Sequence, residues 1–230
     1  MYEGIIEAII KLFAIITNFR DQSSAESTLL VDSYLKENLS REMEDKYKDL
    51  YQRFVNYYHV DHREIFYKND GNGSRYINKK YLINICNGIV DHYDLSTRFV
   101  IISQLLNFIK RDDNLNFDDL KMVNVVARGL KIDSHEYENL YRFSLFSIDK
   151  VKDKSCLFVV NGKPTYHDKN INHLYRENQQ VEIEFIRIHS INALYLKYWG
   201  PRNLYLNGHR LDQQRIYIFP QGGIRCWSSR

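Results

Sequence analysis

Of the 230 residues, 44% are hydrophobic, 27% are charged and only three are proline. This composition is typical of a folded globular protein and excludes a disordered linker or tail. The net charge of +3 conceals an asymmetry, because residues 151–230 hold 12 Lys and Arg against 6 Asp and Glu, or +6, which leaves −3 for residues 1–150. The opposite signs indicate two units, of which the second either faces an anionic partner or simply displays its solvating charges.

The cysteine pattern and the hydropathy favour a cytoplasmic chain. Three cysteines lie far apart without a C-x-x-C pair, so neither a disulfide framework nor a cysteine zinc site is encoded. The apolar run from Ile5 to Ile16 is interrupted by Glu7 and Lys11, which predicts a core helix rather than a signal peptide. No other stretch approaches the roughly 20 apolar residues that cross a bilayer. We therefore expect no membrane span.

The first half of the chain shows helical periodicity. Apolar residues recur at helical spacing from Ile5 to Ile16, which predicts a first helix. Ser23 and Glu26 form a capping-box signature, so a second helix should begin near Ala25. A third helix is predicted after Ser40. Its apolar face is aromatic, and such a stripe is typical of a core: Tyr47, Leu50, Tyr51, Phe54 and Tyr58.

Further helices follow a break in the pattern. The stretch from His59 to Tyr76 is rich in Asn, Asp and Gly, which predicts a surface loop. The helical period resumes near Tyr81, which predicts a fourth helix. Three more are predicted: one behind a Ser96 cap, one from Asn116 to about Gly129, and one after Ser134. Seven helices with almost no strand signal predict an all-α bundle over residues 1–150.

Two polar clusters in this part could bind a cation. The segment RDDNLNFDD alternates oxygen ligands, but Phe117 occupies the glycine position of a calcium loop and Val123 the position of its bidentate glutamate, which excludes an EF-hand. It is either a capping loop, with Asn116 as the cap, or a weak metal site. The second cluster has no H-E-x-x-H motif and is interpreted as solvated loop residues: His59, Asp61, His62 and Glu64.

Beyond Lys150 the pattern becomes alternating, as in strands. Strands are predicted at residues 157–160, 181–188, 194–198, 204–206, 216–219 and 224–227. A phase slip after Phe185 predicts a bulge or twist. Asn207 and Gly208 between two such runs predict a type I′ hairpin. Residues 151–230 are therefore predicted to form a small all-β sandwich or barrel, which makes the chain α+β with two domains.

The chain lacks the motifs of several enzyme classes. No G-x-x-x-x-G-K-[ST] phosphate loop, G-x-S-x-G elbow or dinucleotide fingerprint occurs, so we expect no catalytic activity. Nucleic-acid binding is suggested by aromatic residues among the arginines of the β segment, but alternating strands bury half of them and +6 is a modest charge. We therefore expect no nucleic-acid partner and keep that function as an alternative.

The helical pattern and its acidic loop resemble the TerB-like domain of tellurite-resistance proteins, a bundle of two similar halves with acidic turns associated with a metal ion. Asp112 takes the first acidic position of the second half, Asp113 replaces its glycine and Asp119 its glutamate. In the first half only Glu26 matches. The resemblance implies these four residues as candidate ligands of a divalent metal.

Over nearly its whole length the chain is similar to the N-terminal region of large ABC-transporter-like ATP-binding proteins of Bacteroidetes. IIKLFAIIT, RDDNLNFDD and NLYLNGHRLDQQRIYIFPQGGIR carry this likeness. In that family a TerB-like bundle and a β domain similar to a forkhead-associated domain precede the ATPase and membrane segments. The Asn207–Gly208 turn, with Leu211, resembles the end of a forkhead-associated domain, whereas its phosphothreonine-reading Arg and Ser have no counterpart here.

The resemblance implies a non-catalytic regulatory or interaction region at the cytoplasmic face of the membrane. Its partner would be another protein or a downstream ATPase domain, and it would reach the membrane only through a parent transporter. Two alternatives remain open. The first is a metal-sensing TerB-like stress-response module, and the second is nucleic-acid or phosphopeptide binding by the basic β domain.

Overall fold

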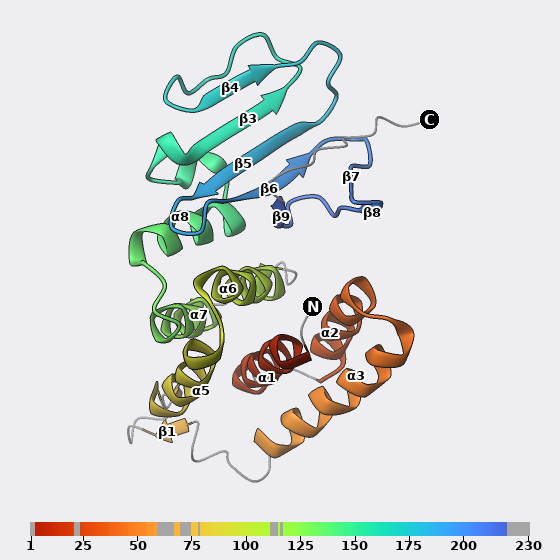
Figure 1. Cartoon of the computed structure of the whole chain (residues 1–230), viewed down its shortest axis with the longest axis vertical. Coiled ribbons are helices and arrows are strands. Elements are labelled where there is room, and N and C mark those ends of the chain that lie inside the picture. Colours follow the sequence, from red (N-terminus) through yellow and green to blue (C-terminus); the bar gives the residue numbers. More distant parts are fainter. Residues whose placement is uncertain are drawn as a thin grey trace. The chain divides into compact units, whose positions relative to one another are not determined.

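The protein is α+β, and its computed structural model describes residues 3–20, 24–58, 67–69, 75–77, 79–110, 115 and 117–219. Within these residues there are seven α-helices, a five-stranded sheet and two two-stranded sheets (Figure 1). The chain divides into two compact units, Met1–Ile132 and Asp133–Arg230, here called the helical unit and the sheet unit. This boundary precedes the predicted one at Lys150, because helix α8 groups with the sheet that follows it.

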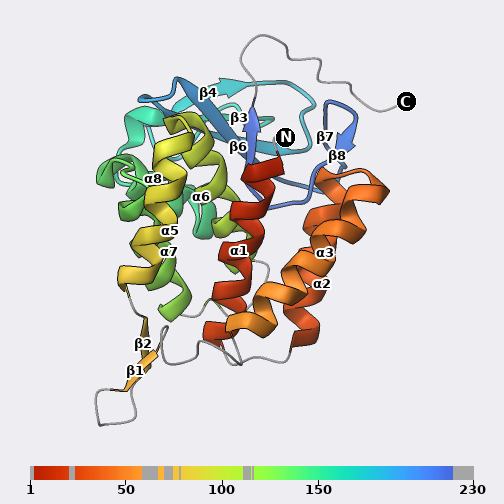
Figure 2. The ribbon, with the colours of Figure 1, turned by 60° about the horizontal axis from the view of Figure 1, so that its bottom comes forward.

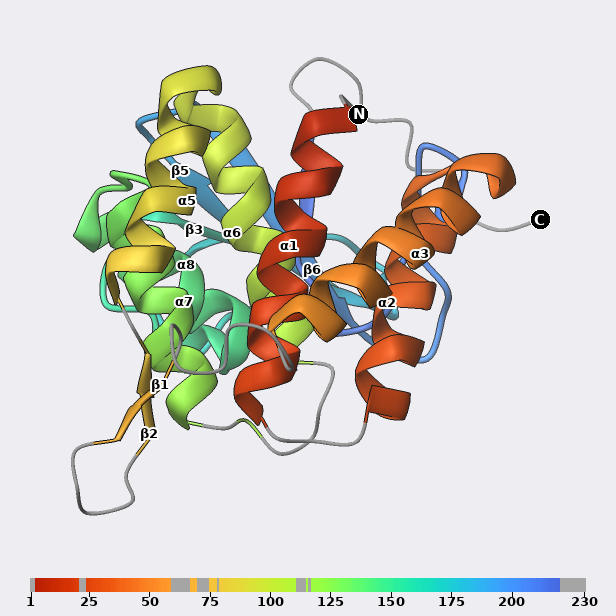
Figure 3. The ribbon, with the colours of Figure 1, turned by 90° about the horizontal axis from the view of Figure 1, so that it is seen from below.

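The helical unit is built around its first helix. Its elements are α1 (Glu3–Arg20), α2 (Ser24–Asn38), α3 (Arg41–Asn56), α5 (Lys79–His92), α6 (Leu95–Lys110) and α7 (Phe117–Gly129). Helix α1 packs against α2, α3, α6 and α7, and Figures 2 and 3 show it between α3 and α6. Because neighbours surround it, Ile9, Leu12, Ile15 and other residues on several sides of α1 are buried. The predicted single stripe is therefore only part of its buried surface.

The aromatic face of α3 is core, as its spacing predicts. Tyr47 and Tyr51 are almost fully buried. The Tyr51 hydroxyl lies 2.9 Å from Thr17 Oγ1, and the Tyr47 hydroxyl donates to the Glu3 carbonyl oxygen at 3.2 Å. These hydrogen bonds satisfy the polar ends of buried phenols and fix α3 against α1.

Several helix starts differ from prediction by one or two residues. The cap of α6 is Asp94 rather than Ser96, and its carboxylate accepts a backbone N–H at 2.8 Å. The cap of α8 is Asp133, whose side chain accepts two backbone N–H groups. Ser40 does precede α3, although its side chain makes no capping hydrogen bond. Aspartate caps a helix as well as serine does and adds a favourable negative charge at the helix N-terminus, which explains why aspartate caps α6 and α8.

The predicted surface loop between α3 and α5 contains a short hairpin. Strands β1 (Tyr67–Asn69) and β2 (Arg75–Ile77) pair antiparallel. Asn, Asp and Gly residues indicate a loop, but they are also typical of the turn that joins hairpin strands. The sequence pattern therefore did not distinguish an irregular loop from a hairpin. The cluster from His59 to Glu64 and the predicted caps Ser23 and Asn116 lie outside the described residues.

The sheet unit begins with a helix and is therefore not the predicted all-β sandwich. It contains α8 (Ser134–Leu145), the 3-10 turns η2 (Ile148–Lys150) and η3 (Lys154–Cys156), and strands β3 (Leu157–Asn161), β4 (Asn172–Tyr175), β5 (Glu182–Ile188), β6 (Ala193–Trp199), β7 (Tyr205–Leu206), β8 (His209–Arg210) and β9 (Tyr217–Phe219). The order of the main sheet is β4-β3-β5-β6-β9, with only the β3–β4 pair parallel. Helix α8 packs against β5.

Strand β5 is regular, so of the two predicted causes of the phase slip, a bulge or a twist, the bulge is wrong. It pairs with β6 without interruption from Glu182–Trp199 to Ile188–Ala193. One face of the sheet lies under α8, and the other holds a cluster that includes Ile183, Leu196 and Tyr198. Because both faces are covered, apolar residues occur at both parities, which produces the apparent phase slip.

The hairpin prediction at Asn207 is confirmed, whereas one strand was missed. Asn207 and Gly208 have φ values of 52° and 83° and join β7 to β8, as a type I′ turn requires. Strand β4 was not predicted, because its four residues show no apolar alternation. The predicted strand at residues 224–227 lies outside the described residues.

Helices α5 and α7 pack tightly at Gly129, which yields a stability prediction. A Cβ atom at Gly129 would lie 2.8 Å from Cys86 Cβ and Sγ. We expect Gly129→Ala to destabilise the protein by about 1–3 kcal/mol through overpacking. The matched control is Gly88→Ala on α5, where a Cβ meets nothing within 4 Å, so it should stabilise by roughly 0.5–1 kcal/mol. Urea denaturation of both variants tests this, and equal stability of the two would contradict the close approach.

Candidate functional site

A buried ion pair lies inside the sheet unit. Glu184 of β5 and Lys197 of β6 are directly opposite in the antiparallel ladder. Their side chains are 5% and 0% exposed, and Lys197 Nζ lies 3.1 Å from Glu184 Oε2, at ion-pair distance without the alignment of a hydrogen bond. Charged residues that alternate with apolar ones along a strand usually face solvent, whereas Glu184 lies on the covered face of the sheet.

The Lys197 ammonium also holds the end of helix α8. It donates to the carbonyl oxygens of Phe143 at 2.8 Å and Phe146 at 2.7 Å. Carbonyls in the last turn of a helix have no intrahelical partner and carry partial negative charge, so they suit a cation. The ammonium lies 4.8 Å from the centre of the Phe143 ring and 5.5 Å from that of Trp199. Lys197 therefore joins α8 to the centre of the sheet.

Burial dominates the protonation of both partners. It lowers the pKa of Lys197 below its ordinary value, against the attraction of Glu184. It raises the pKa of Glu184, against the attraction of Lys197. Each charge is therefore expensive to bury alone and is tolerated because the other is present.

The opposite end of α8 is fixed as well. The Glu136 carboxylate, in the first turn of α8, accepts the backbone N–H of Ser190 at 2.9 Å and also its hydroxyl. Ser190 belongs to the turn between β5 and β6. With Lys197 at one end and Glu136 at the other, α8 is an integral part of the sheet unit.

A second polar group lies on the same face, where β3 ends. Asn161, which is 2% exposed, donates from Nδ2 to Glu182 Oε2 at 2.8 Å, and its Oδ1 lies 3.0 Å from His173 Nε2. The ring of Tyr166 stacks on that of His173 at 5.6 Å. Burial raises the pKa of Tyr166, and the nearby carboxylate of Glu182 adds to the shift. These side chains bind one another and form a polar end to the sheet.

Strand β4 forms one edge of the sheet (Figure 1). The Arg176 N–H donates to the Asn161 carbonyl oxygen at 2.8 Å, toward β3. Backbone groups alternate between the two sides of a strand, so those of His173 and Tyr175 point away from β3. The side chains of Leu174 and Tyr175 are each 45% exposed. The edge therefore presents hydrogen-bonding groups and apolar side chains together.

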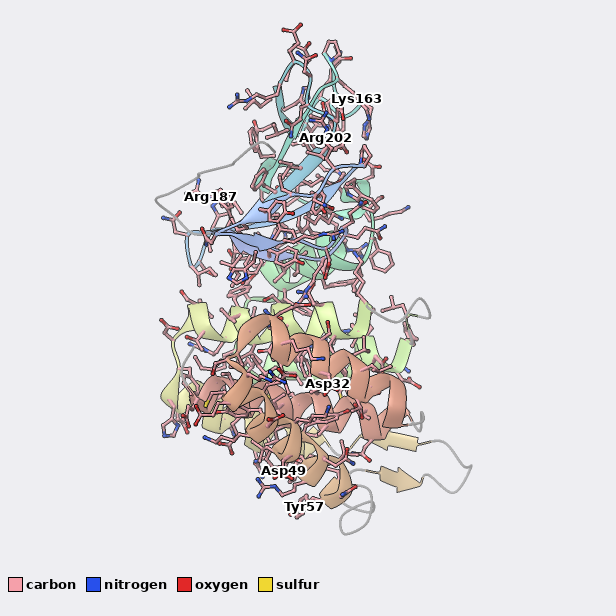
Figure 4. All side chains as sticks on the ribbon, turned by 90° about the vertical axis from the view of Figure 1, so that its right-hand side faces the viewer. Asp32, Asp49, Tyr57, Lys163, Arg187 and Arg202 are labelled. Carbon is pink, nitrogen blue, oxygen red and sulfur yellow. The ribbon has the colours of Figure 1, made fainter. Side chains whose placement is uncertain are left out.

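Cationic side chains lie at both ends of the sheet. Figure 4 shows Lys163 and Arg202 at one end and Arg187 nearer the other. The first two follow β3 and β6, which finish at the same end of the ladder, whereas Arg187 is close to the β5–β6 turn. These three cations are thus spread out rather than gathered into one patch.

The structure describes only part of the predicted metal site. Asp112 and Asp113 lie outside the described residues, and the side chain of Glu26, on α2, is not described either. Asp119 lies in the first turn of α7 and is fully buried. Within the described ranges, no three His, Cys, Asp or Glu side chains are grouped to hold a metal ion. The four-residue metal site stays a prediction.

Other candidate groups are buried. Cys86 and Cys156 are free thiols, and burial raises the pKa of each to about 12. Tyr195 and Tyr198, two of the aromatic residues of the β segment on which the nucleic-acid alternative depends, are at most 2% exposed and form part of the core. Among the residues that the structure places, no helix is long and apolar enough to span a membrane.

The sequence pattern predicted neither the Lys197–Glu184 pair nor the β4 edge, although one signal of the buried pair was present. A lysine in the otherwise apolar and aromatic run of β6 marks a cation within a covered strand, and its partner follows only once the β5–β6 register is known. Comparison with known proteins adds no further assignment: no family model, curated protein or solved structure matches this chain.

Proposed function

We propose that this chain is a non-catalytic interaction module that docks an extended segment of a protein partner along edge strand β4. The observation that carries the proposal is the exposure of Leu174 and Tyr175, each 45%, on a strand paired only with β3 among the described residues. Addition of a strand would pair the outward backbone groups and cover both side chains.

The chemistry of β4 supports a docking role. An edge strand is a template for unwanted pairing, and proteins usually protect it with lysine, proline or a bulge. Strand β4 reads Asn-His-Leu-Tyr and has none of the three. Its unprotected edge is therefore consistent with a strand that is meant to be paired.

The regulatory part of the proposal comes from the resemblance of the sequence to the TerB-like domain and to ABC-transporter-like ATP-binding proteins. We propose that the helical unit is a TerB-like bundle, that the sheet unit is similar to a forkhead-associated domain, and that the chain regulates an ATPase from the cytoplasmic face of a membrane. The order of a helical unit before a sheet-containing unit is compatible with this parentage.

Peptide selection tests the docking surface. Random peptides displayed on phage and selected on the purified chain should bind the wild type and lose binding to Leu174→Lys, because a charge on the edge opposes strand addition. The matched control is Leu29→Lys on α2, which is also at an exposed leucine (68%) and should keep binding. Selected peptides that bind all three proteins equally would show that β4 is not the docking surface.

A further inference from the structure

We infer that the segment docked on β4 is β4 of a second copy of this chain, which joins two sheets across a two-fold axis at Leu174. This inference rests on the proposed function, because it names the partner of the same edge. A two-fold interface brings the same surface of both copies together, so the edge must complement itself. Backbone direction, side chains and charge each bear on that requirement.

The backbone groups allow such a pairing. His173 and Tyr175 point their N–H and C=O groups away from β3, and Leu174 points its own toward β3. An antiparallel pair must place outward-pointing residues opposite one another. With the axis at Leu174, His173 of one copy faces Tyr175 of the other, and the two residues exchange both hydrogen bonds. The register is therefore compatible with a symmetric dimer.

The side chains also complement one another in this register. Leu174 meets Leu174 of the second copy in a non-hydrogen-bonded pair, where Cα atoms are about 4.5 Å apart and side chains are closest. Each of these leucines is 45% exposed in the single chain. On the other face, Tyr175 lies beside His173 of the second copy, a cross-strand aromatic pair of a stabilising kind. Both exposed apolar side chains of β4 are thus covered.

Charge favours a second copy over a charged peptide. The four residues of β4 carry no formal charge at pH 7, with histidine neutral. An acidic or basic peptide would therefore find no opposite charge along the strand. In the symmetric register the first flanking charge, Arg176, comes opposite Asn172, so no like charges are opposed. The neutral, partly aromatic strand is suited to another strand of the same kind.

Disulfide trapping tests the register directly. In a Cys226→Ser background, Leu174→Cys should form a disulfide-linked dimer with oxidised glutathione, because Cα atoms about 4.5 Å apart lie within disulfide range. The other cysteines, Cys86 and Cys156, are buried. The matched control is Asn172→Cys, on the same strand and face, whose two copies would lie roughly 14 Å apart and should stay unlinked. Equal cross-linking of both variants would overturn the register.

Light scattering tests the assembly without cysteines. The molar mass measured by light scattering as the wild-type chain elutes from a size-exclusion column should be twice the 27.6 kDa of one chain, and that of Leu174→Lys should equal one chain. A wild-type monomer at every concentration, with no Leu174→Cys dimer, would overturn the inference. If selected peptides still required Leu174 in that case, the proposed docking function would stand without the dimer. If they did not, both would be lost.

Discussion

Replacing Lys197 with methionine is expected to lower the free energy of unfolding of the sheet unit by about 3–5 kcal/mol. The change leaves the carboxylate of Glu184, 5% exposed, without its cation and removes the donor to the Phe143 and Phe146 carbonyls. Urea denaturation of the full chain followed by tryptophan fluorescence measures it. Both tryptophans, Trp199 and Trp227, belong to the sheet unit, so the signal reports this unit.

Two further variants show whether burial of the ion pair causes the loss of stability in Lys197→Met. Adding Glu184→Leu to Lys197→Met should recover most of the loss, because a buried ion pair can be replaced by apolar side chains at little cost. Lys163→Met is the matched control, since that lysine is 72% exposed and 3.5 Å from Glu182, so its loss should be within about 1 kcal/mol. Equal losses for Lys163→Met and Lys197→Met would contradict a special role for the buried pair.

The same defect should depend on pH. Burial already raises the pKa of Glu184, and Lys197 is the main influence that opposes the shift. Without Lys197 this pKa rises further. A raised pKa in the folded state gives stability that is present at low pH and lost as pH rises through the folded value. The stability deficit of Lys197→Met relative to wild type should therefore shrink as pH falls from neutral toward the ordinary range of a carboxyl group, and a constant deficit would contradict this.

Local pattern predicted the helices but not their grouping. The helical period after Ser134 is real, yet the same amphipathic stripe can pack on a bundle or on a sheet, so α8 was assigned to the bundle. What places it in the sheet unit is its packing on β5 and the contacts of Lys197 and Glu136 with distant residues. Such long-range contacts leave little trace in a single sequence. The Asn207–Gly208 hairpin was predictable because its signal is local.

The candidate site was the least predictable part of the protein. Glu182 and Glu184 alternate with apolar residues as on a solvated strand face, and only the β5–β6 register shows that Glu184 faces Lys197 beneath α8. Strand β4 pairs in parallel with β3, so no hairpin turn joins the two strands and no turn signal marks β4 in the sequence. Its four residues are mostly exposed, so they also lack the apolar alternation of a half-buried strand. Pattern reasoning favours polar loops as sites, whereas these features follow from tertiary pairing.

Phe13→Ala is expected to lower the free energy of unfolding of the helical unit by about 3–5 kcal/mol. Phe13 is 1% exposed in the central helix α1. Its ring stacks on that of Phe108 at 4.2 Å between centroids and meets Tyr34 edge-on at 5.2 Å. Removing it leaves a cavity between α1, α2 and α6. Urea denaturation followed by far-UV circular dichroism, which is sensitive to helix content, measures the loss.

Phe117→Ala is the control for size and residue type. Phe117 begins α7 and is 70% exposed, and its ring contacts only the Lys121 ammonium at 4.6 Å among the interactions described for it. An exposed cation–π contact is worth about 0.5–1 kcal/mol, so this variant should lose no more than that. If the two variants lost equal stability, α1 would not be the centre of the helical unit. A large loss confined to Phe13→Ala would instead agree with a core organised around α1.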